Sequence, residues 1–350
     1  MDFGVNLPFA MENALAILMA ALIFNLVFCK ESLLNRTFRS PVAIVSRLVD
    51  TFERRYNRPE LSPAMRRADG ISIVFSSLIM ALAVGFVFEI LATLMPYGWL
   101  VEVAVIATLF SLRPHLDHSR ILAEALERDV AEARATLALT TGRDAHRLDE
   151  LGIARAGIET SAISFAEGIL TPVIYFLMFG VPGLFAFKII NVGANMIDVR
   201  STDFADFGNA FCRLNSIFLW PGVKLAVIFI SLSALFTKPS KSFTALTAGF
   251  GKCPGFFRPH LGAPVAALAG ALNTRLGGPV CFEEKTIEGC WLNENAPEPL
   301  SHHMLEARSI FFLASMIVVA TLVLFYNFDI WMPADSLRGF GAWVWSLFTS

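Results

Sequence analysis

Three long apolar runs constrain this chain more than any other feature of its sequence. They cover residues 11–29, 71–95 and 309–328. An α-helix of about 20 residues, rising about 1.5 Å per residue, crosses the roughly 30 Å hydrocarbon core of a bilayer. Weaker candidate spans, short or interrupted by proline, follow at 98–112, 169–190 and 216–236. With 55% hydrophobic and 17% charged residues, the sequence predicts an all-α, polytopic integral membrane protein with about six transmembrane helices.

The distribution of basic residues predicts how these spans are oriented. Lysine and arginine are frequent in segments 30–69, 113–167 and 237–307 and sparse in the other connections. By the positive-inside rule, these three segments are large cytoplasmic loops and both chain ends lie outside. The first residues carry Asp2 and Glu12 but no lysine or arginine, so we expect the first apolar run to be a retained anchor. Residues 1–350 are expected to form one membrane domain.

Charge and cysteine content exclude several classes of function. The formal net charge of −2 argues against a polyanionic partner, so no nucleic acid is expected. The five cysteines form no CxxC pair and are expected to be free thiols. His115 and His118 lie three residues apart, but no accompanying carboxylate pattern supports a metal site. No phosphate-binding loop or dinucleotide fingerprint is present.

Helical periodicity predicts further helices inside the polar segments. Apolar residues recur at three- and four-residue steps through 116–140, and 263–276 is a shorter run rich in small residues. The region 169–213 is ambiguous because Gly180, Pro182 and Gly183 interrupt it. It fits either a span with a connection or a re-entrant hairpin.

The first candidate site follows Gly142 and lies at the cytoplasmic edge. Arg143 and Asp144 precede a predicted helix on which Arg155, Glu159 and Glu167 share one slowly drifting stripe. One interpretation is a site for an anionic, metal-bound ligand. The other is an ion pair within a solvated helix that enters the membrane.

Polar residues inside apolar segments form the second group of candidates. Lys188 and Asn191 lie near the end of a predicted span, where Lys188 either binds an anion or extends to the interface. The second of these is favoured. Glu89 and Glu102 are expected at the outer ends of their spans, with interfacial or helix-pairing roles.

With these residues in view, the chain resembles the CobD/CbiB family of adenosylcobinamide-phosphate synthases. The resemblance runs from about residue 39 to about residue 328 and rests on many landmarks in one order. They are Ser40-Pro-Val42 with Arg47-Leu-Val49, Thr141-Gly-Arg-Asp144 with Leu148-Asp-Glu150, Arg155-Ala-Gly-Ile-Glu159, Gly168 with Pro172, Val181-Pro-Gly183 with Phe187-Lys188 and Asn191, Phe207-Gly208, Arg213, Pro221, Gly262-Ala-Pro264, Ala269-Gly-Ala-Leu272 and Arg275-Leu-Gly-Gly278.

This resemblance implies a role in cobalamin biosynthesis at a bacterial plasma (inner) membrane. Family members use ATP and Mg²⁺ to join an aminoalcohol phosphate to a propionate of adenosylcobyric acid, so the implied partners are the bilayer and a corrinoid. A homo-oligomer or other membrane proteins of the pathway are possible partners as well. The residues expected to bind ligand are Arg143, Asp144, Glu159, Glu167, Lys188, Asn191 and Arg213. Glu159 and Glu167 are the expected metal ligands.

The chain departs from the family pattern at several acidic positions. Residues such as Ile163, Ala194, Asn215 and Ser216 stand where the pattern has acidic or amide side chains. Two functions therefore remain open at the level of sequence. The first is an ATP-dependent amide-forming ligase. The second is a non-catalytic membrane paralogue that binds a corrinoid or partner proteins, as the related AmpE family has a non-synthase role.

Overall fold

Helices make up nearly all of the computed structural model, which describes residues 11–29, 41–57, 61–141, 143–197, 205–251, 256, 258–281 and 286–327. The long helices of this part of the chain are α1 (Met11–Phe28), α3 (Pro41–Tyr56), α4 (Pro63–Leu94), α5 (Gly98–Leu109), α6 (Leu112–Arg128), α7 (Val130–Ala138), α8 (Glu150–Phe165), α9 (Thr171–Ile197), α10 (Ala205–Thr237), α11 (Pro239–Phe250), α12 (Gly262–Leu272) and α13 (Ser301–Asn327). Short helical turns are η1 (Ala145–Arg147), η2 (Ala166–Leu170) and η4 (Pro259–Leu261).

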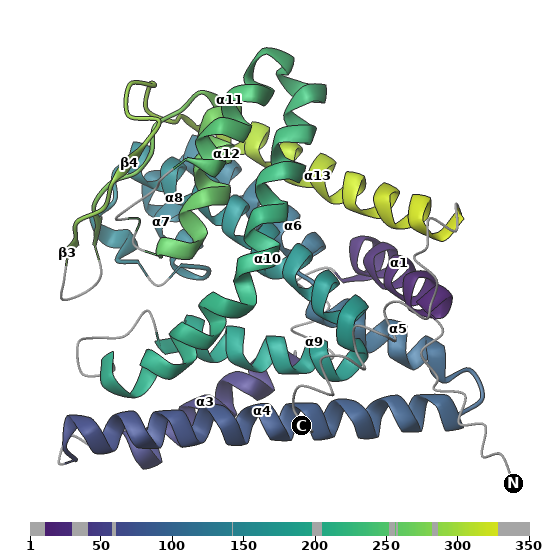
Figure 1. Ribbon diagram of the computed structural model, residues 1–350. Coiled ribbons are helices and arrows are strands. Elements are labelled where there is room, and N and C mark those ends of the chain that lie inside the picture. Colours follow the sequence, from purple (N-terminus) through teal and green to yellow (C-terminus); the bar gives the residue numbers. More distant parts are fainter. Residues whose placement is uncertain are drawn as a thin grey trace, which may run out of the picture.

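Five helical stretches are long and apolar enough to cross a membrane. They are Pro63–Leu94, Gly98–Arg128, Glu150–Met196, Phe207–Thr237 and Ser301–Asn327, and the shorter apolar helix Ala14–Phe28 accompanies them. The predicted all-α, multi-pass membrane architecture is therefore confirmed. In Figure 1, α4 runs along one edge of the molecule, and α9 and the first part of α10 lie against it.

Two pairs of two-residue strands lie at one end of this assembly, beside α7, α8 and α12 (Figure 1). β1 (Leu276–Gly277) pairs antiparallel with β4 (Trp291–Leu292), and β2 (Val280–Cys281) pairs with β3 (Thr286–Ile287). The turn between α4 and α5 lies at the opposite end. The strands and this turn are thus suited to lie on opposite sides of a bilayer.

The predicted helix 116–140 is wrong in one respect, because the structure breaks it at Asp129. The backbone of Asp129 is extended, and its side chain accepts a hydrogen bond from the Glu132 amide at 3.3 Å. Aspartate is a good N-cap because its carboxylate satisfies an amide that has no partner within the helix. The two resulting helices, α6 and α7, still bury Leu122 and Leu137, two of the predicted apolar positions. The short helix predicted at 263–276 is found as α12, which ends at Leu272.

The start of α6 docks on a π-helical turn, η2, inside the longest helical stretch. Pro172 has no amide hydrogen, so the Gly168 carbonyl loses the partner that a regular helix would supply. The Ser111 amide donates to that carbonyl instead, at 3.2 Å. A side chain at position 168 would meet the Ser111 Cβ at 2.7 Å. Gly168 and Pro172 together therefore open a docking point for another helix in the middle of an apolar segment.

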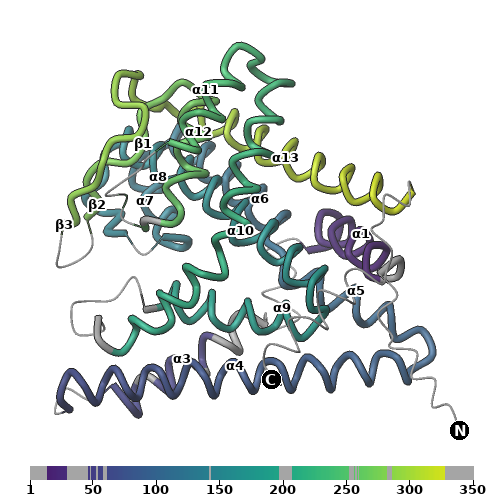
Figure 2. Tube along the Cα trace, viewed as in Figure 1, coloured from purple at the N-terminus to yellow at the C-terminus, as the bar shows by residue number. Residues whose placement is uncertain are grey.

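The stretch Glu150–Met196 is a hairpin and not one straight helix. Gly180 has φ 66° and ψ −154°, a non-helical conformation, and Pro182 follows it. The Asn195 side-chain amide donates to Glu167 Oε2 at 3.1 Å across 28 residues, which a straight helix would separate by about 42 Å. The segment predicted as the single span 169–190 thus turns back on itself, as the re-entrant alternative predicted. Figure 2 traces the reversal in α9.

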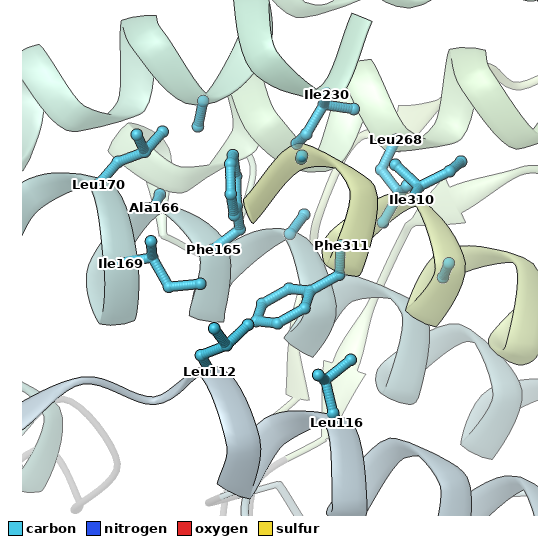
Figure 3. Packing of buried hydrophobic residues seen from close by; sticks show 14 of the residues in the cluster. Leu112, Leu116, Phe165, Ala166, Ile169, Leu170, Ile230, Leu268, Ile310 and Phe311 are labelled. Carbon is cyan, nitrogen blue, oxygen red and sulfur yellow. The ribbon is translucent and has the colours of Figure 1, made fainter. Parts of the chain in front are cut away.

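One large apolar core holds the helices together behind this hairpin. Phe311 of α13 lies among Leu112 and Leu116 of α6 and Phe165 of α8 (Figure 3). The Phe165 and Phe311 rings meet edge to face with centroids 6.0 Å apart, a favourable aromatic geometry. The core therefore holds in place the outgoing leg of the hairpin, which is the part before Gly180 and carries Glu159 and Glu167. The part after Gly180 is the returning leg.

Thiol labelling tests the predicted sidedness of these two ends. Cys281 is in β2 and Cys290 directly precedes β4, at the end that we expect on the cytoplasmic side, whereas Tyr97 is exposed in the α4–α5 turn. In intact cells, a membrane-impermeant maleimide should label a Tyr97→Cys variant and leave Cys281 and Cys290 unlabelled until the cells are lysed. Labelling of Cys281 before lysis would reverse the topology. Cys253, which belongs to the same expectation, lies outside the described residues.

Candidate functional site

A cavity of about 250 Å³ lies where the returning leg of the hairpin meets α10 and the segment before α12. The residues lining it come from η2, α9, α10 and the region of η4. They are Glu167, Ala194, Asn195, Cys212, Arg213, Asn215, Ser216, Leu219, Arg258, His260 and Leu261. Most of these side chains are polar or charged, although the surrounding helices are apolar. A polar cavity in a membrane helix bundle is the usual setting of a functional site.

Glu167 is the acidic group of this cavity within the described part of the chain. It is buried, and its Oε2 accepts the hydrogen bond from Asn195. Asn195 in turn accepts at Oδ1 from the Arg258 guanidinium, at 3.1 Å. Oε1 of Glu167 makes no hydrogen bond to the described residues. Because a buried carboxylate oxygen is costly to leave unpaired, this atom is a natural acceptor for a ligand donor.

Lys188 and Asn191 lie beside Glu167, about two turns and one turn, respectively, before Asn195 on the same helix face. The Lys188 charge acts on Glu167, and the Lys188 side chain is only 7% exposed. The prediction that Lys188 extends to the membrane interface is therefore wrong. Asn191 donates to Asn215 Oδ1 of α10 at 3.3 Å, which holds the two helices together at the edge of the cavity.

Arg213 supplies an available positive charge at this site. The residue is exposed yet lines the cavity, and it forms no ion pair with any described residue. Arg258 lines the same cavity from the segment before α12. Two arginines, with Lys188 nearby, outnumber the one carboxylate, so these groups together favour an anionic ligand.

The other predicted residues form a separate cluster against the β-strands. Glu159 is 0% exposed; it pairs with Arg143 and accepts from the Gly277 amide at 2.7 Å. The alternative of an ion pair within a solvated helix is therefore wrong, since Arg155 instead approaches Glu298 at 3.8 Å. We call Arg143, Glu159 and Gly277 the clamp, because they join three distant segments of the chain.

Asp144 also belongs to the structure around the clamp. Its carboxylate accepts from the His146 amide at 3.1 Å and pairs with Arg147, while its own amide donates to the Cys281 carbonyl at 3.0 Å. These contacts cap η1 and attach the loop to β2. The structure thus separates Arg143, Asp144 and Glu159 from Glu167, Lys188, Asn191 and Arg213.

The two predicted metal ligands are not brought together. Glu159 and Glu167 are eight residues apart on one helical stretch, which corresponds to about 12 Å along its axis. No group of three or more histidine, cysteine or acidic side chains in the described ranges is arranged to hold a metal ion. His115 instead shares a hydrogen bond with Ser161 at 3.0 Å, and His118 with Thr140 at 2.9 Å. Metal binding by Glu159 and Glu167 stays a prediction.

Comparison with known proteins gives the family. Residues 18–311 match the model of the family described as CobD/Cbib protein. The chain belongs to the CobD/CbiB family. Proteins named "Cobalamin biosynthesis protein CobD" are similar to it: the one from Brucella suis is 28% identical, over 90% of this chain and 97% of its own length.

Two further relatives with the same name extend this match. The one from a Sinorhizobium species is 30% identical, over 89% of this chain and 98% of its own length. The one from Rhodobacter capsulatus is 27% identical, over 89% of this chain and 98% of its own length. No solved structure matches the chain.

The positions where this chain is expected to differ from the CobD/CbiB family pattern can be located in the structure. Ala194, Asn215 and Ser216, where the chain departs from that pattern, all line the cavity. The retained Gly168 and Pro172 shape η2, and Val181-Pro-Gly183 lies at the hairpin reversal. Ile163, the fourth such position, does not line the cavity, so the positions that differ from the expected pattern lie both inside and outside it.

Sequence reasoning missed Asn195, Arg258 and His260 as site residues. Asn195 had a detectable signal, because Lys188, Asn191 and Asn195 follow the i, i+3, i+7 spacing of one helix face. Arg258 and His260 had no such signal, since they lie more than 60 residues along the chain from Asn195. Only tertiary folding brings Arg258 to Asn195, to which it donates a hydrogen bond across 63 residues.

Proposed function

We propose that this CobD/CbiB family member acts in cobalamin biosynthesis and that its cavity binds a small aminoalcohol phosphate. The observation that carries this proposal is the pairing of opposite charges in one small cavity. Glu167 offers an unpaired carboxylate oxygen, and Arg213 and Arg258 offer guanidinium groups. A ligand with an amine at one end and a phosphate at the other satisfies both.

Each end of such a ligand has a matching group. A guanidinium binds phosphate oxygens through two parallel hydrogen bonds, so Arg213 and Arg258 suit the phosphate. The ligand amine donates to Glu167 Oε1. The cavity, at about 250 Å³, lies just below the range of sites for drug-sized molecules. It therefore suits an aminoalcohol phosphate, while a corrinoid would present its propionate from outside.

The family reaction joins the amine nitrogen to an activated carboxylate. The amine must lose a proton before or during attack, and Glu167 and His260 are described cavity residues that can accept it. Divalent metal with ATP is a poorer fit, because Glu167 is the single carboxylate among the described lining residues. We therefore assign no step to Mg²⁺.

That same observation favours a second candidate function, a membrane paralogue that binds the ligand without turnover. A cavity with two arginines and one carboxylate can hold a phosphate, whereas metal-assisted activation of a carboxylate usually draws on additional acidic ligands. In both proposals the protein lies in a bacterial inner membrane with its N-terminus outside and the cavity open to the cytoplasm.

Calorimetric titration of the detergent-solubilised protein with aminopropanol phosphate and ethanolamine phosphate tests ligand binding. Arg213→Ala should weaken binding by about 10- to 100-fold, because a hydrogen-bonded charge contributes about 1.5–3 kcal/mol. Arg120→Ala is the matched control, since Arg120 pairs with Glu124 on an exposed face of α6 and surface pairs contribute little. Absence of binding by the unmodified protein would overturn the proposal.

Turnover separates the two candidate functions. The protein that binds the ligand is supplied with adenosylcobyric acid and Mg-ATP, beside a family member with the complete acidic pattern. Amide product supports the synthase. Binding without product, while the control is active, supports the non-catalytic paralogue.

A further inference from the structure

We propose that α10 does not cross the bilayer. Both of its ends lie at the membrane face that carries the β-strands, and its second half forms with α11 a helical hairpin that lies in the lipid leaflet on that side. The stretch Phe207–Thr237 is long and apolar enough to cross, so its length does not decide its path. The inference is independent of the proposed function, because it concerns the chain and not a ligand.

The start of α10 lies at the polar end of α4. A side chain at position 70 would clash with the Phe207 carbonyl oxygen, so the two backbones are in close contact there. Gly70 directly precedes the apolar run 71–95 and follows a polar stretch that includes Arg67. This end of α4 is opposite to the α4–α5 turn, and it therefore lies on the side of the β-strands (Figure 1).

The end of α10 lies at the polar end of α13. Lys238, which directly follows α10, pairs with Glu306 at 2.7 Å. Glu306 lies three residues before the apolar run 309–328, and α13 is the helix that follows β4 along the chain. Lys241 of α11 donates to Asn273 Oδ1, between α12 and β1, at 3.0 Å. The two ends of α10 are therefore on the same side of the bilayer.

The hairpin in α9 makes the same path necessary for a second reason. Segments 113–167 and 237–307 contact each other where Glu159 accepts from the Gly277 amide, so they lie on one side. Between them, α9 reverses and returns to that side. A single crossing by α10 would then place the two segments on opposite sides, which their contact excludes.

A proline and close helix packing give α10 its shape. Pro221 lies inside the helix, and an interior proline removes a hydrogen bond and bends a helix. The second half of α10 turns away from α4 and runs across its direction (Figures 1 and 2). α11 packs back along this half: Ser242 donates to the Ser231 carbonyl at 2.7 Å, and a side chain at Gly249 would meet Val227 at 2.5 Å.

One edge of this second hairpin is apolar and exposed. We call it the apolar edge, and its members are Leu225, Ile228, Leu232 and Leu235 of α10 and Phe243 of α11. The four aliphatic residues recur at three- and four-residue steps, and Phe243 is 75% exposed. Large apolar side chains with lysines beside them are typical of helices that lie in the bilayer interface. Lys238 and Lys241 supply those charges, so the occupant of the apolar edge is lipid.

The depth of two α10 residues tests this path in vesicles of phosphatidylethanolamine and phosphatidylglycerol. Nitroxides are attached at Leu225→Cys and Leu235→Cys in full-length protein whose native cysteines are replaced by alanine. Accessibility to oxygen and to a nickel chelate reports their depth. In a crossing helix, ten residues separate the two depths by about 15 Å. We expect a difference below about 5 Å, because an interfacial helix keeps its residues at similar depth.

Two positions on α13 are the matched control for depth. Phe312→Cys and Val323→Cys are partly exposed positions on a helix that crosses, and their depths should differ by more than about 10 Å. A similar difference between positions 225 and 235 would overturn the proposal. A nitroxide at Phe243→Cys that is reached by the nickel chelate but not by oxygen would place the apolar edge in water. Spin–spin broadening at that position would assign the apolar edge to a second copy of the chain, and either result would overturn the contact with lipid.

Sidedness tests the start of α10 by a different measurement, without removal of the native cysteines. Intact cells and inverted vesicles are treated with a membrane-impermeant maleimide, and mass spectrometry maps the labelled peptides. Asn209→Cys should be labelled in the same preparation as Leu139→Cys, which is 82% exposed at the end of α7, and in the opposite one from Tyr97→Cys. Labelling of Asn209→Cys together with Tyr97→Cys would show that α10 crosses and would overturn the proposal.

Discussion

Glu159→Ala should lower the free energy of unfolding by about 3–5 kcal/mol, the range measured when one partner of a buried ion pair is removed. Glu159 is fully buried and holds both the Arg143 guanidinium and the Gly277 amide. Alanine would remove the carboxylate that the buried Arg143 guanidinium pairs with and the acceptor of the buried Gly277 amide. The measurement is the thermal or denaturant midpoint of the protein in detergent, followed by tryptophan fluorescence.

Two further variants distinguish this structural role from metal binding. Glu159→Gln retains an oxygen for the Gly277 amide and should lose less stability than alanine. The double variant Arg143→Met with Glu159→Leu should lose less than the sum of the two single changes, because neither charge remains buried. A Glu159→Ala protein of normal stability that has lost Mg²⁺-dependent ligand binding would contradict the clamp and support the metal-ligand prediction.

Gly180→Ala should destabilise the protein by about 1–3 kcal/mol and abolish aminoalcohol-phosphate binding. Position 180 combines φ 66° with ψ −154°, a conformation that is accessible essentially to glycine alone. The same reversal also brings Pro182 against α4 at Gly85, where a side chain would lie 2.5 Å from the Pro182 Cα. Without the reversal, Lys188, Asn191 and Asn195 cannot return to Glu167.

Met178→Leu is the control in the same hairpin. Met178 lies two residues before the reversal and is 54% exposed, so the substitution should change neither stability nor binding appreciably. The measurements are ligand titration and the unfolding midpoint of both variants. A Gly180→Ala protein that binds the ligand with normal affinity would show that the reversal does not require the glycine conformation.

Local patterns explain why much of the fold is predictable. The length of an apolar run is set by bilayer thickness, so 71–95 and 309–328 are recognisable without any tertiary contact. The break at Asp129 was missed because apolar periodicity continues through it, and only its capping contact with Glu132 shows where one helix ends. Glycine and proline indicate that a helix is interrupted, but they do not indicate whether the chain then continues or reverses. The hairpin therefore remained one of two alternatives.

The candidate site was only partly predictable for a physical reason. Lys188 and Asn191 are identifiable because a polar side chain in an apolar segment is conspicuous, whereas Arg213 was implied by the family resemblance. The interpretation of Arg155, Glu159 and Glu167 as one site went too far. Helical spacing shows which residues share a helix face, but it does not show which other segments contact that face.

The sequence by itself determined that this protein is a helical membrane protein of the CobD/CbiB family, since apolar length and ordered landmarks are local properties. Only the tertiary structure decided which polar residues share a site. A reversal at Gly180 and a hydrogen bond between Arg258 and Asn195 across 63 residues depend on how distant segments pack, and packing leaves no periodic signal in the chain. The same packing assigned Glu159 to the clamp and Glu167 to the cavity.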